Sequence, residues 1–79
     1  MVIVEWEDST QPIASWEWID NYTSPTTMRC LSVGYVIGET KDALALAPNL
    51  GDFEYDRVQA GGIIRIPRSA VRRITSPKL

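Results

Sequence analysis

Over several short stretches the chain alternates hydrophobic and polar residues with a period of two, the pattern of half-buried β-strands. Residues 2–7 (VIVEWE) and residues 43–47 (ALALA) both show this alternation and are followed by turn-forming residues. Two strands of a mostly β domain are therefore expected there. The side chains expected to face the core are Val2, Val4 and Trp6 in the first strand and Leu44 and Leu46 in the second.

The longest predicted strand covers residues 28–39. It has one face of large hydrophobic side chains and one face of mostly small ones. The glycines on the second face predict strong strand curvature or close approach of a neighbouring backbone. The first face holds Leu31, Val33, Tyr35 and Ile37, and the second holds Cys30, Ser32, Gly34, Val36 and Gly38.

The last third of the chain predicts how the domain closes. Residues 63–66 (IIRI) form an apolar run that stops at Pro67, and residues 71–74 (VRRI) begin another alternation. The three residues between them predict one tight 3₁₀-like turn. Many small five-stranded barrels close with this strand, turn and strand, so we expect such a barrel. In it, Ile64 and Ile66 point inward and Arg65 is exposed.

Two connections are long for so small a domain. Residues 12–20 begin with a proline and predict a short N-terminal helix or helical turn, followed by a loop over residues 21–27. Residues 48–61 form the second connection, and long loops of this kind are often functional or mobile. Part of it, with Phe53, Tyr55 and Val58, is compatible with hairpin arms that extend two strands.

The length and the charge distribution restrict the class of protein. A chain of 79 residues holds one domain, residues 1–79, with a thin core. Its net charge is −2, but residues 1–56 carry all ten acids and two bases, whereas residues 57–79 carry six bases and no acid. Either the two parts pack together and neutralise each other, or the last two strands form an anion-binding patch.

The residue types present exclude most catalytic chemistry. The chain has no histidine and one cysteine, Cys30, so it can build neither a catalytic triad nor an ordinary zinc site. The motif of the phosphate-binding loop is missing. The acids at positions 52, 54 and 56 have the spacing of calcium ligands, but Arg57 stands where the calcium loop needs glycine. We expect no enzyme activity, no cofactor and no metal.

The sequence also predicts a compartment. A single cysteine allows no internal disulfide and suits a reducing cytoplasm. Residues 1–15 lack the basic start and apolar stretch of a signal peptide, and no apolar run approaches the roughly 18–20 residues that span a bilayer. A cytoplasmic protein without a membrane partner is therefore expected.

Three tryptophans are a large number for a chain of 79 residues. Trp6 lies on the apolar face of the first strand and is predicted to be in the core, as is Trp16. For Trp18 two alternatives remain, either packing in the core or a loop, or a contact with a ligand or second subunit, because tryptophan is a favoured interface anchor.

The arginines concentrate around the closing turn. Guanidinium groups grip phosphate and aromatic rings stack on bases, so together these side chains predict a site for a nucleotide or a short single strand. The alternative is that the arginines are solvated or pair with the acidic part of the chain. The candidate ligand-binding residues are Arg57, Arg65, Arg68, Arg72, Arg73, Trp18 and Tyr55.

Several short motifs are spread over nearly the full length of the chain. They are Trp6-Glu7-Asp8-Ser9, a second tryptophan after it, Cys30 a few residues before Gly34, residues 42–47 (DALALA), residues 66–71 (IPRSAV) and Ile74. This set resembles the motifs of small uncharacterised proteins of tailed bacteriophages and prophages. The resemblance implies an Sm-like or SH3-like β-barrel, a fold that often assembles into rings, expressed in the cytoplasm of a bacterial host. It implies no catalytic residues, and the chain is more acidic than RNA-binding Sm proteins.

Three functional hypotheses follow. The first is a phage-encoded, non-enzymatic binding protein, in its sharpest form an anti-defence factor that sequesters a nucleotide-type immune signal at the subunit interfaces of a homo-oligomer. The second is an Sm-like protein that binds single-stranded RNA or DNA, with strong salt dependence. The third is an adaptor that docks onto a host or virion protein.

Overall fold

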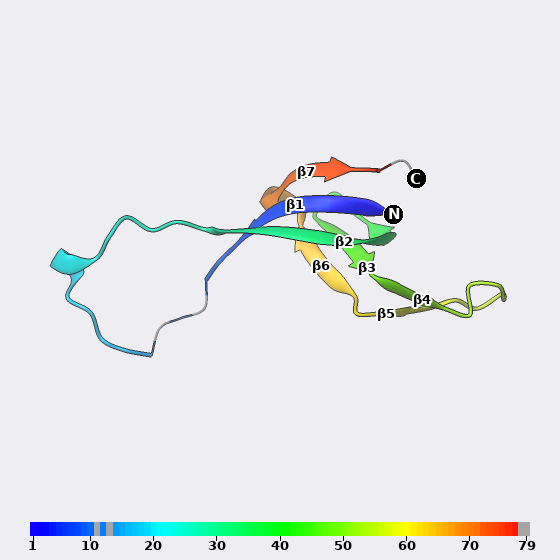
Figure 1. Cartoon of the computed structure of the whole chain (residues 1–79), viewed down its shortest axis with the longest axis horizontal. Coiled ribbons are helices and arrows are strands. Elements are labelled where there is room, and N and C mark those ends of the chain that lie inside the picture. The colour runs from blue at the N-terminus through cyan, green and yellow to red at the C-terminus, as the bar shows by residue number, and fades with distance from the viewer. Residues whose placement is uncertain (11, 13, 78–79) are drawn as a thin grey trace.

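The computed structural model describes residues 1–10, 12 and 14–77, and this part is mostly antiparallel β-structure (Figure 1). The elements are β1 (Val2–Asp8), the 3₁₀ turn η1 (Ile19–Asn21), β2 (Met28–Glu39), β3 (Ala43–Ala47), β4 (Asn49–Gly51), β5 (Gln59–Gly61), β6 (Ile64–Pro67), the 3₁₀ turn η2 (Arg68–Ala70) and β7 (Val71–Thr75). Five strands form a sheet in the order β6-β3-β2-β1-β7, and β4 pairs with β5. Within the described residues, no helix has the length and apolar character needed to cross a membrane.

The predicted closing segment is confirmed. β6 ends at Pro67, η2 makes a single turn and β7 follows at once. The turn is tied to the start of the neighbouring strand β3, because the backbone N–H of Arg68 donates to the carbonyl oxygen of Asp42 at 2.9 Å. This bond joins η2 to the β2–β3 turn, so the end of β6 has a defined position before the chain enters β7.

The core is small and lies on one face of the sheet, where the alternation of β1, β3 and β6 predicted it. The four large side chains that are fully buried come from three strands, the neighbours β3 and β6 and, beyond β2, the strand β1. The sequence predictions for these positions are confirmed. The buried side chains are Val4, Leu44, Leu46 and Ile66, and Val2, Trp6, Ile64, Ala70 and Val71 pack against them.

The predicted close approach of backbones at Gly34 is also confirmed. A Cβ atom placed on Gly34 would lie 2.9 Å from the carbonyl oxygen of Ala47. The glycine therefore lets β2 and β3 come together where β2 changes partner, because Val2 to Asp8 pair with its first half and Ala43 to Ala47 with its second. The register shifts between Val36 and Gly38, as expected for a bent strand.

The sheet differs from the predicted five-stranded barrel. β6 and β7 are the two ends of the strand order, and no ladder joins them among the described residues. There are also two more strands than expected. Pro48 has no N–H to donate and separates β3 from β4, so β4 and β5 form a hairpin that continues β3 and β6. Phe53, Tyr55 and Val58 lie in the loop beyond these hairpin arms, not in the strands.

Residues 14–27, here called the arm, leave the sheet where the β1–β2 ladder ends at Asp8 and Met28 (Figure 1). The helical segment expected over residues 12–20 is limited to the turn η1, while Gln11 and Ile13 lie outside the described residues. The core prediction for Trp16 is wrong, because its exposed fraction is 103%. The arm projects beyond the single small core, so nothing in the sheet covers this indole.

The arm and the β4–β5 hairpin make the molecule long. It measures 58 × 25 × 25 Å, with a radius of gyration of 16.9 Å. A compact domain of this length would have a radius of gyration of about 12 Å. The two projections therefore lie outside the compact body, and their side chains are available to other molecules.

Candidate functional site

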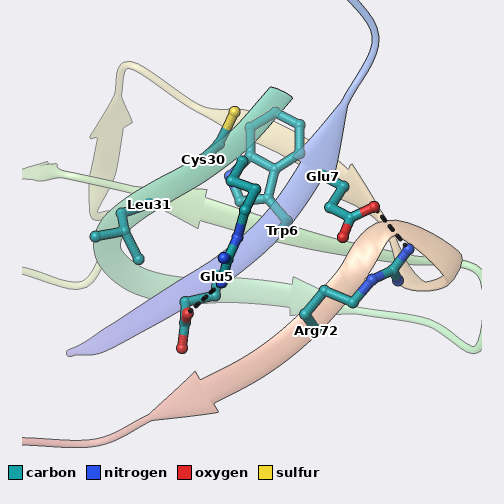
Figure 2. Close-up of a pocket in the computed structure, with 7 residues that line it drawn as sticks. Glu5, Trp6, Glu7, Cys30, Leu31 and Arg72 are labelled. Carbon is teal, nitrogen blue, oxygen red and sulfur yellow. Dashed lines mark hydrogen bonds and ion pairs between the residues drawn. The ribbon is translucent and has the colours of Figure 1, made fainter. Parts of the chain in front are cut away.

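A groove of about 640 Å³ lies beside β1, close to the base of the arm. Side chains of β1, β2 and β7 meet there (Figure 2). It combines two carboxylates and two guanidinium groups with an indole and a leucine. The lining residues are Glu5, Trp6, Glu7, Arg29, Cys30, Leu31 and Arg72.

Glu7 and Arg72 form the best-defined ion pair of this groove. The Arg72 guanidinium donates to Glu7 at 3.2 Å (Figure 2). The Thr27 hydroxyl donates to the same carboxylate oxygen at 3.0 Å. The hydrogen bond from Arg72, supported by the one from Thr27, holds the pKa of Glu7 below its ordinary value. Glu7 is therefore a weak base whose charge is already balanced, which suits a structural role at the base of the arm.

Glu5 lies between two arginines on neighbouring strands. Its carboxylate is 3.4 Å from Arg73 Nε on β7 and 3.9 Å from an Arg29 nitrogen on β2. The register explains this arrangement, because Glu5 pairs directly with Arg73 on one side and with Leu31 on the other. Two cations around one anion leave a local charge of +1, and both arginines are largely exposed.

The inner wall of the groove is formed by Trp6 and Cys30, which are register partners. The indole N–H of Trp6 donates to the Ser32 hydroxyl at 3.0 Å. The Cys30 sulfur lies 3.8 Å from the Met28 carbonyl oxygen and is half-buried. This wall is thus held by contacts within the β1–β2 pair. It gives the groove one apolar side between charged ends.

A third arginine of the closing turn is held at the opposite edge of the sheet. The Arg68 guanidinium lies 2.6 Å from the Glu39 carboxylate, and its Nε donates to the Thr40 carbonyl oxygen at 3.4 Å. Arg68, Arg72 and Arg73 therefore all face carboxylates of the acidic part of the chain. This matches the alternative in which the two parts neutralise each other.

The structure does not bring the predicted ligand-binding residues together in one chain. Trp18 lies in the arm at one end of the molecule, and Tyr55 and Arg57 lie in the loop beyond β4 and β5 at the other end (Figure 1). Arg65 is exposed on β6, as predicted, and no ion pair among the described residues involves it or Arg57. A pocket that combines these groups would need more than one copy of the chain.

Sequence reasoning did not select the charged groove residues Glu5, Glu7 and Arg29 as binding candidates, nor the other lining residues Trp6, Cys30 and Leu31. A signal was present, since acids alternate on β1 and bases follow each other on β7, and adjacent strands of opposite charge attract. The sequence does not show, however, that β1 and β7 are neighbouring strands.

A second hollow, of about 430 Å³, lies near the other end of the molecule. It is lined by Tyr35, Pro48, Asn49, Leu50 and Phe53.

The acidic residues at positions 52, 54 and 56 do not gather into a metal site. Over the described ranges no group of three potential ligands could hold a metal ion. Asp52 accepts a hydrogen bond from the Gln59 amide at 2.9 Å, and its carbonyl oxygen accepts one from the Tyr55 N–H. It also has a positive φ of 57°, so this residue shapes the turn between β4 and β5.

Comparison of the chain with protein-family models, with curated proteins and with solved structures gives no match.

Proposed function

We propose that this chain is a non-enzymatic binding module that recognises a protein through its arm, the adaptor class among the three hypotheses. The observation that carries the proposal is the exposure of the arm. Trp16, Trp18 and Ile19 expose 103%, 81% and 89% of their surface. Tryptophans of this kind are the usual anchors of protein interfaces, and large apolar patches left in solvent mark such interfaces.

The groove supports the same class. Its two carboxylates and two guanidinium groups balance one another, so it offers little net attraction for a phosphate. A mixed-charge groove with an apolar wall is better suited to a peptide chain, which brings both charge signs and apolar side chains. The lowered pKa of Glu7 also favours a binding role, because a good general base has a pKa near the working pH.

We also propose that the sheet is related to the SH3-like or Sm-like fold. The order β6-β3-β2-β1-β7, with one 3₁₀ turn between the two end strands, supports an open variant of the SH3-like or Sm-like arrangement. With the motif resemblance, this supports a phage-type accessory protein that acts in the cytoplasm of a bacterial host. The adaptor function rests on the exposed arm and stands without this assignment.

Site-specific crosslinking tests the adaptor function. A photoreactive phenylalanine analogue replaces Trp18 in the full chain, and a matched control carries it at Thr40, in the β2–β3 turn far from the arm. After irradiation in bacterial cells, we expect covalent protein adducts from position 18 that the control does not give. If position 18 gives no protein adduct beyond the control, the adaptor function is rejected.

The nucleotide hypothesis ranks second because three of its four closing-turn arginines face carboxylates. The observation that still supports the nucleotide hypothesis is the exposure of Arg65 on β6. Calorimetric titration against cyclic and linear nucleotides tests it, and titration of single-stranded RNA and DNA at several salt concentrations tests the nucleic-acid hypothesis. Saturable binding that Arg65→Gln abolishes would place anion capture first.

A further inference from the structure

The longest strand turns its hydrophobic face outward. Leu31, Val33, Tyr35 and Ile37 alternate along β2, and their exposed fractions run from 70% at Leu31 to 42% at Ile37. The opposite face, with Ser32 and Gly34, is the one directed toward the core. We call the side of the sheet that carries Leu31, Val33 and Tyr35 the outer face. β2 directs small residues toward the core and large apolar residues toward solvent. An apolar face exposed in this way indicates a surface that another molecule covers.

The exposed area shows how much is left uncovered. The chain exposes 7029 Å², whereas a folded monomer of this mass exposes roughly 4,800 Å². The surplus exceeds 2,000 Å² by this estimate. A standard interface covers about 800 Å² on each partner, so the surplus is large enough for each chain to contribute to two such contacts.

We propose that the arm of a second copy of this chain packs on the outer face of β2, and that the exchange is reciprocal. The inference rests on the proposed function and names the partner of the arm. In a dimer with one two-fold axis, the arm of each chain packs on the outer face of the other, so both arms and both outer faces are covered. The anchors are the aromatic residues of the arm, and the floor is formed by Leu31, Val33 and Tyr35, with Ile3 beside Val33 in the register.

The arm does not reach the outer face of its own chain. The ladder ends at the pair Asp8 and Met28, and the hydrogen bond from Thr27 to Glu7 holds the returning leg beside β1. The arm therefore continues away from the sheet along the strand direction (Figure 1). A second copy turned end for end would place its outer face beside this arm and its own arm beside the first outer face.

Charge favours the same occupant. The arm carries two acids, Glu17 and Asp20, and no base. The end of the outer face near Leu31 carries Arg29 and Arg73 around the single acid Glu5, a local excess of one positive charge. Opposite charges therefore meet when an arm lies on this end of the face, which orients the docking.

The oligomeric state of the full chain tests the inference. Sedimentation equilibrium should give a dimer, and the Trp18→Ser and Leu31→Ser variants should each raise the dimer dissociation constant at least tenfold. Ile63→Ser is the control, since Ile63 is an apolar residue with 53% of its surface exposed that lies outside both surfaces, and it should leave the constant unchanged. Far-ultraviolet circular dichroism confirms that each variant keeps its strands.

A mixing experiment separates arm exchange from other dimers. The Leu31→Ser chain retains a normal arm and the Trp18→Ser chain retains a normal outer face, so a mixed dimer contains one intact contact. We expect the mixture to dimerise more tightly than either variant alone. A monomeric wild-type chain, a dimer that neither variant weakens, or a mixture without this gain would each overturn the inference.

The crosslinking experiment distinguishes this inference from the proposed function. Adducts from position 18 to residues 31–35 of a second copy support arm exchange, whereas the adaptor function also requires adducts to a host or virion protein. Adducts to a different protein, from a chain that sediments as a monomer, retain the adaptor function and reject arm exchange. Absence of any protein adduct rejects both.

Discussion

Trp6 and Ser32 are joined by a hydrogen bond of 3.0 Å from the indole N–H of β1 to the hydroxyl oxygen of β2. The two residues lie on the inward side of the sheet but are not register partners, because Ser32 pairs with Val4 and Trp6 pairs with Cys30. The bond gives a partly buried serine an acceptor role, and it orients the indole against the core. It is thus a direct link between the core and the candidate groove.

Removing this bond should lower stability. Ser32→Ala loses the acceptor and should reduce the free energy of unfolding by about 1 kcal/mol. Trp6→Phe loses the donor and part of the packing, so we expect a loss of about 2 kcal/mol. Urea titration followed by circular dichroism measures both. In the double variant the two losses should fall short of additivity by about 1 kcal/mol, and strict additivity would show that the pair is not coupled.

Gly34→Ala should be among the most destabilising substitutions in the sheet. The new methyl group would lie 2.9 Å from a backbone oxygen of Ala47, which cannot rotate away. We expect a loss of about 2–3 kcal/mol, measured by thermal and urea unfolding. Gly38→Ala is the control on the same strand, because its Cβ atom would be 3.9 Å from the nearest side chain. It should change stability by less than about 0.5 kcal/mol, and equal losses at both sites would contradict the argument.

The Glu7–Arg72 pair predicts a pH dependence of stability. The pKa of Glu7 is lowered in the folded state, mainly by the hydrogen bond from Arg72. Its contribution is therefore present above the unfolded pKa of about 4.3 and is lost as the pH falls through the folded pKa. Urea unfolding from about pH 6 to pH 3 should show stability falling in the acid range, and Arg72→Gln should flatten this fall. Arg65→Gln should keep the wild-type slope, and a parallel slope for Arg72→Gln would reject the assignment.

Arg68 should stabilise the closing turn, because its guanidinium group contacts two oxygen acceptors at once. It faces the Glu39 carboxylate at 2.6 Å and the Thr40 carbonyl oxygen at 3.4 Å, and its side chain is about one-third exposed. Arg68→Gln should cost about 1 kcal/mol, and Arg68→Lys should recover only part of the loss because an ammonium group lacks the planar fork. Exposed Arg65 is the comparison, and its replacement by Gln should be nearly neutral. An equal effect at both positions would show that charge alone matters.

Much of the fold could be predicted from local patterns. The period-two alternation identified Val4, Leu44, Leu46 and Ile66 as core residues, because strand geometry alone decides which side chains share a face. The turn at η2 followed from Pro67 and the short segment after it. The prediction at Gly34 succeeded for a similar reason, since a glycine in a strand often marks a place where backbones meet.

The errors have a common physical origin, which is the pairing of distant segments. The sequence predicts Trp16 in the core, yet the arm has no second layer of its own chain to pack on and the indole is exposed. The exposed face of β2 was recognised as apolar, but composition alone cannot tell which side of a strand a thin core will occupy. The alternative that the acidic and basic parts pair was available, but the specific pairs Glu7–Arg72 and Glu39–Arg68 join residues that are 65 and 29 positions apart in the sequence.

The neighbourhood of β1 and β7 has a consequence for synthesis on the ribosome. Ile3 pairs with Thr75 and Val4 with Ile74, so β1 lacks this neighbour until β7 has been synthesised. Sheets made from such distant partners form slowly, because a long loop must close before its contacts stabilise the fold. The nascent chain therefore presents an unpaired β1 edge while the residues between β1 and β7 are made, and chaperones that shield such edges should be needed most until β7 emerges.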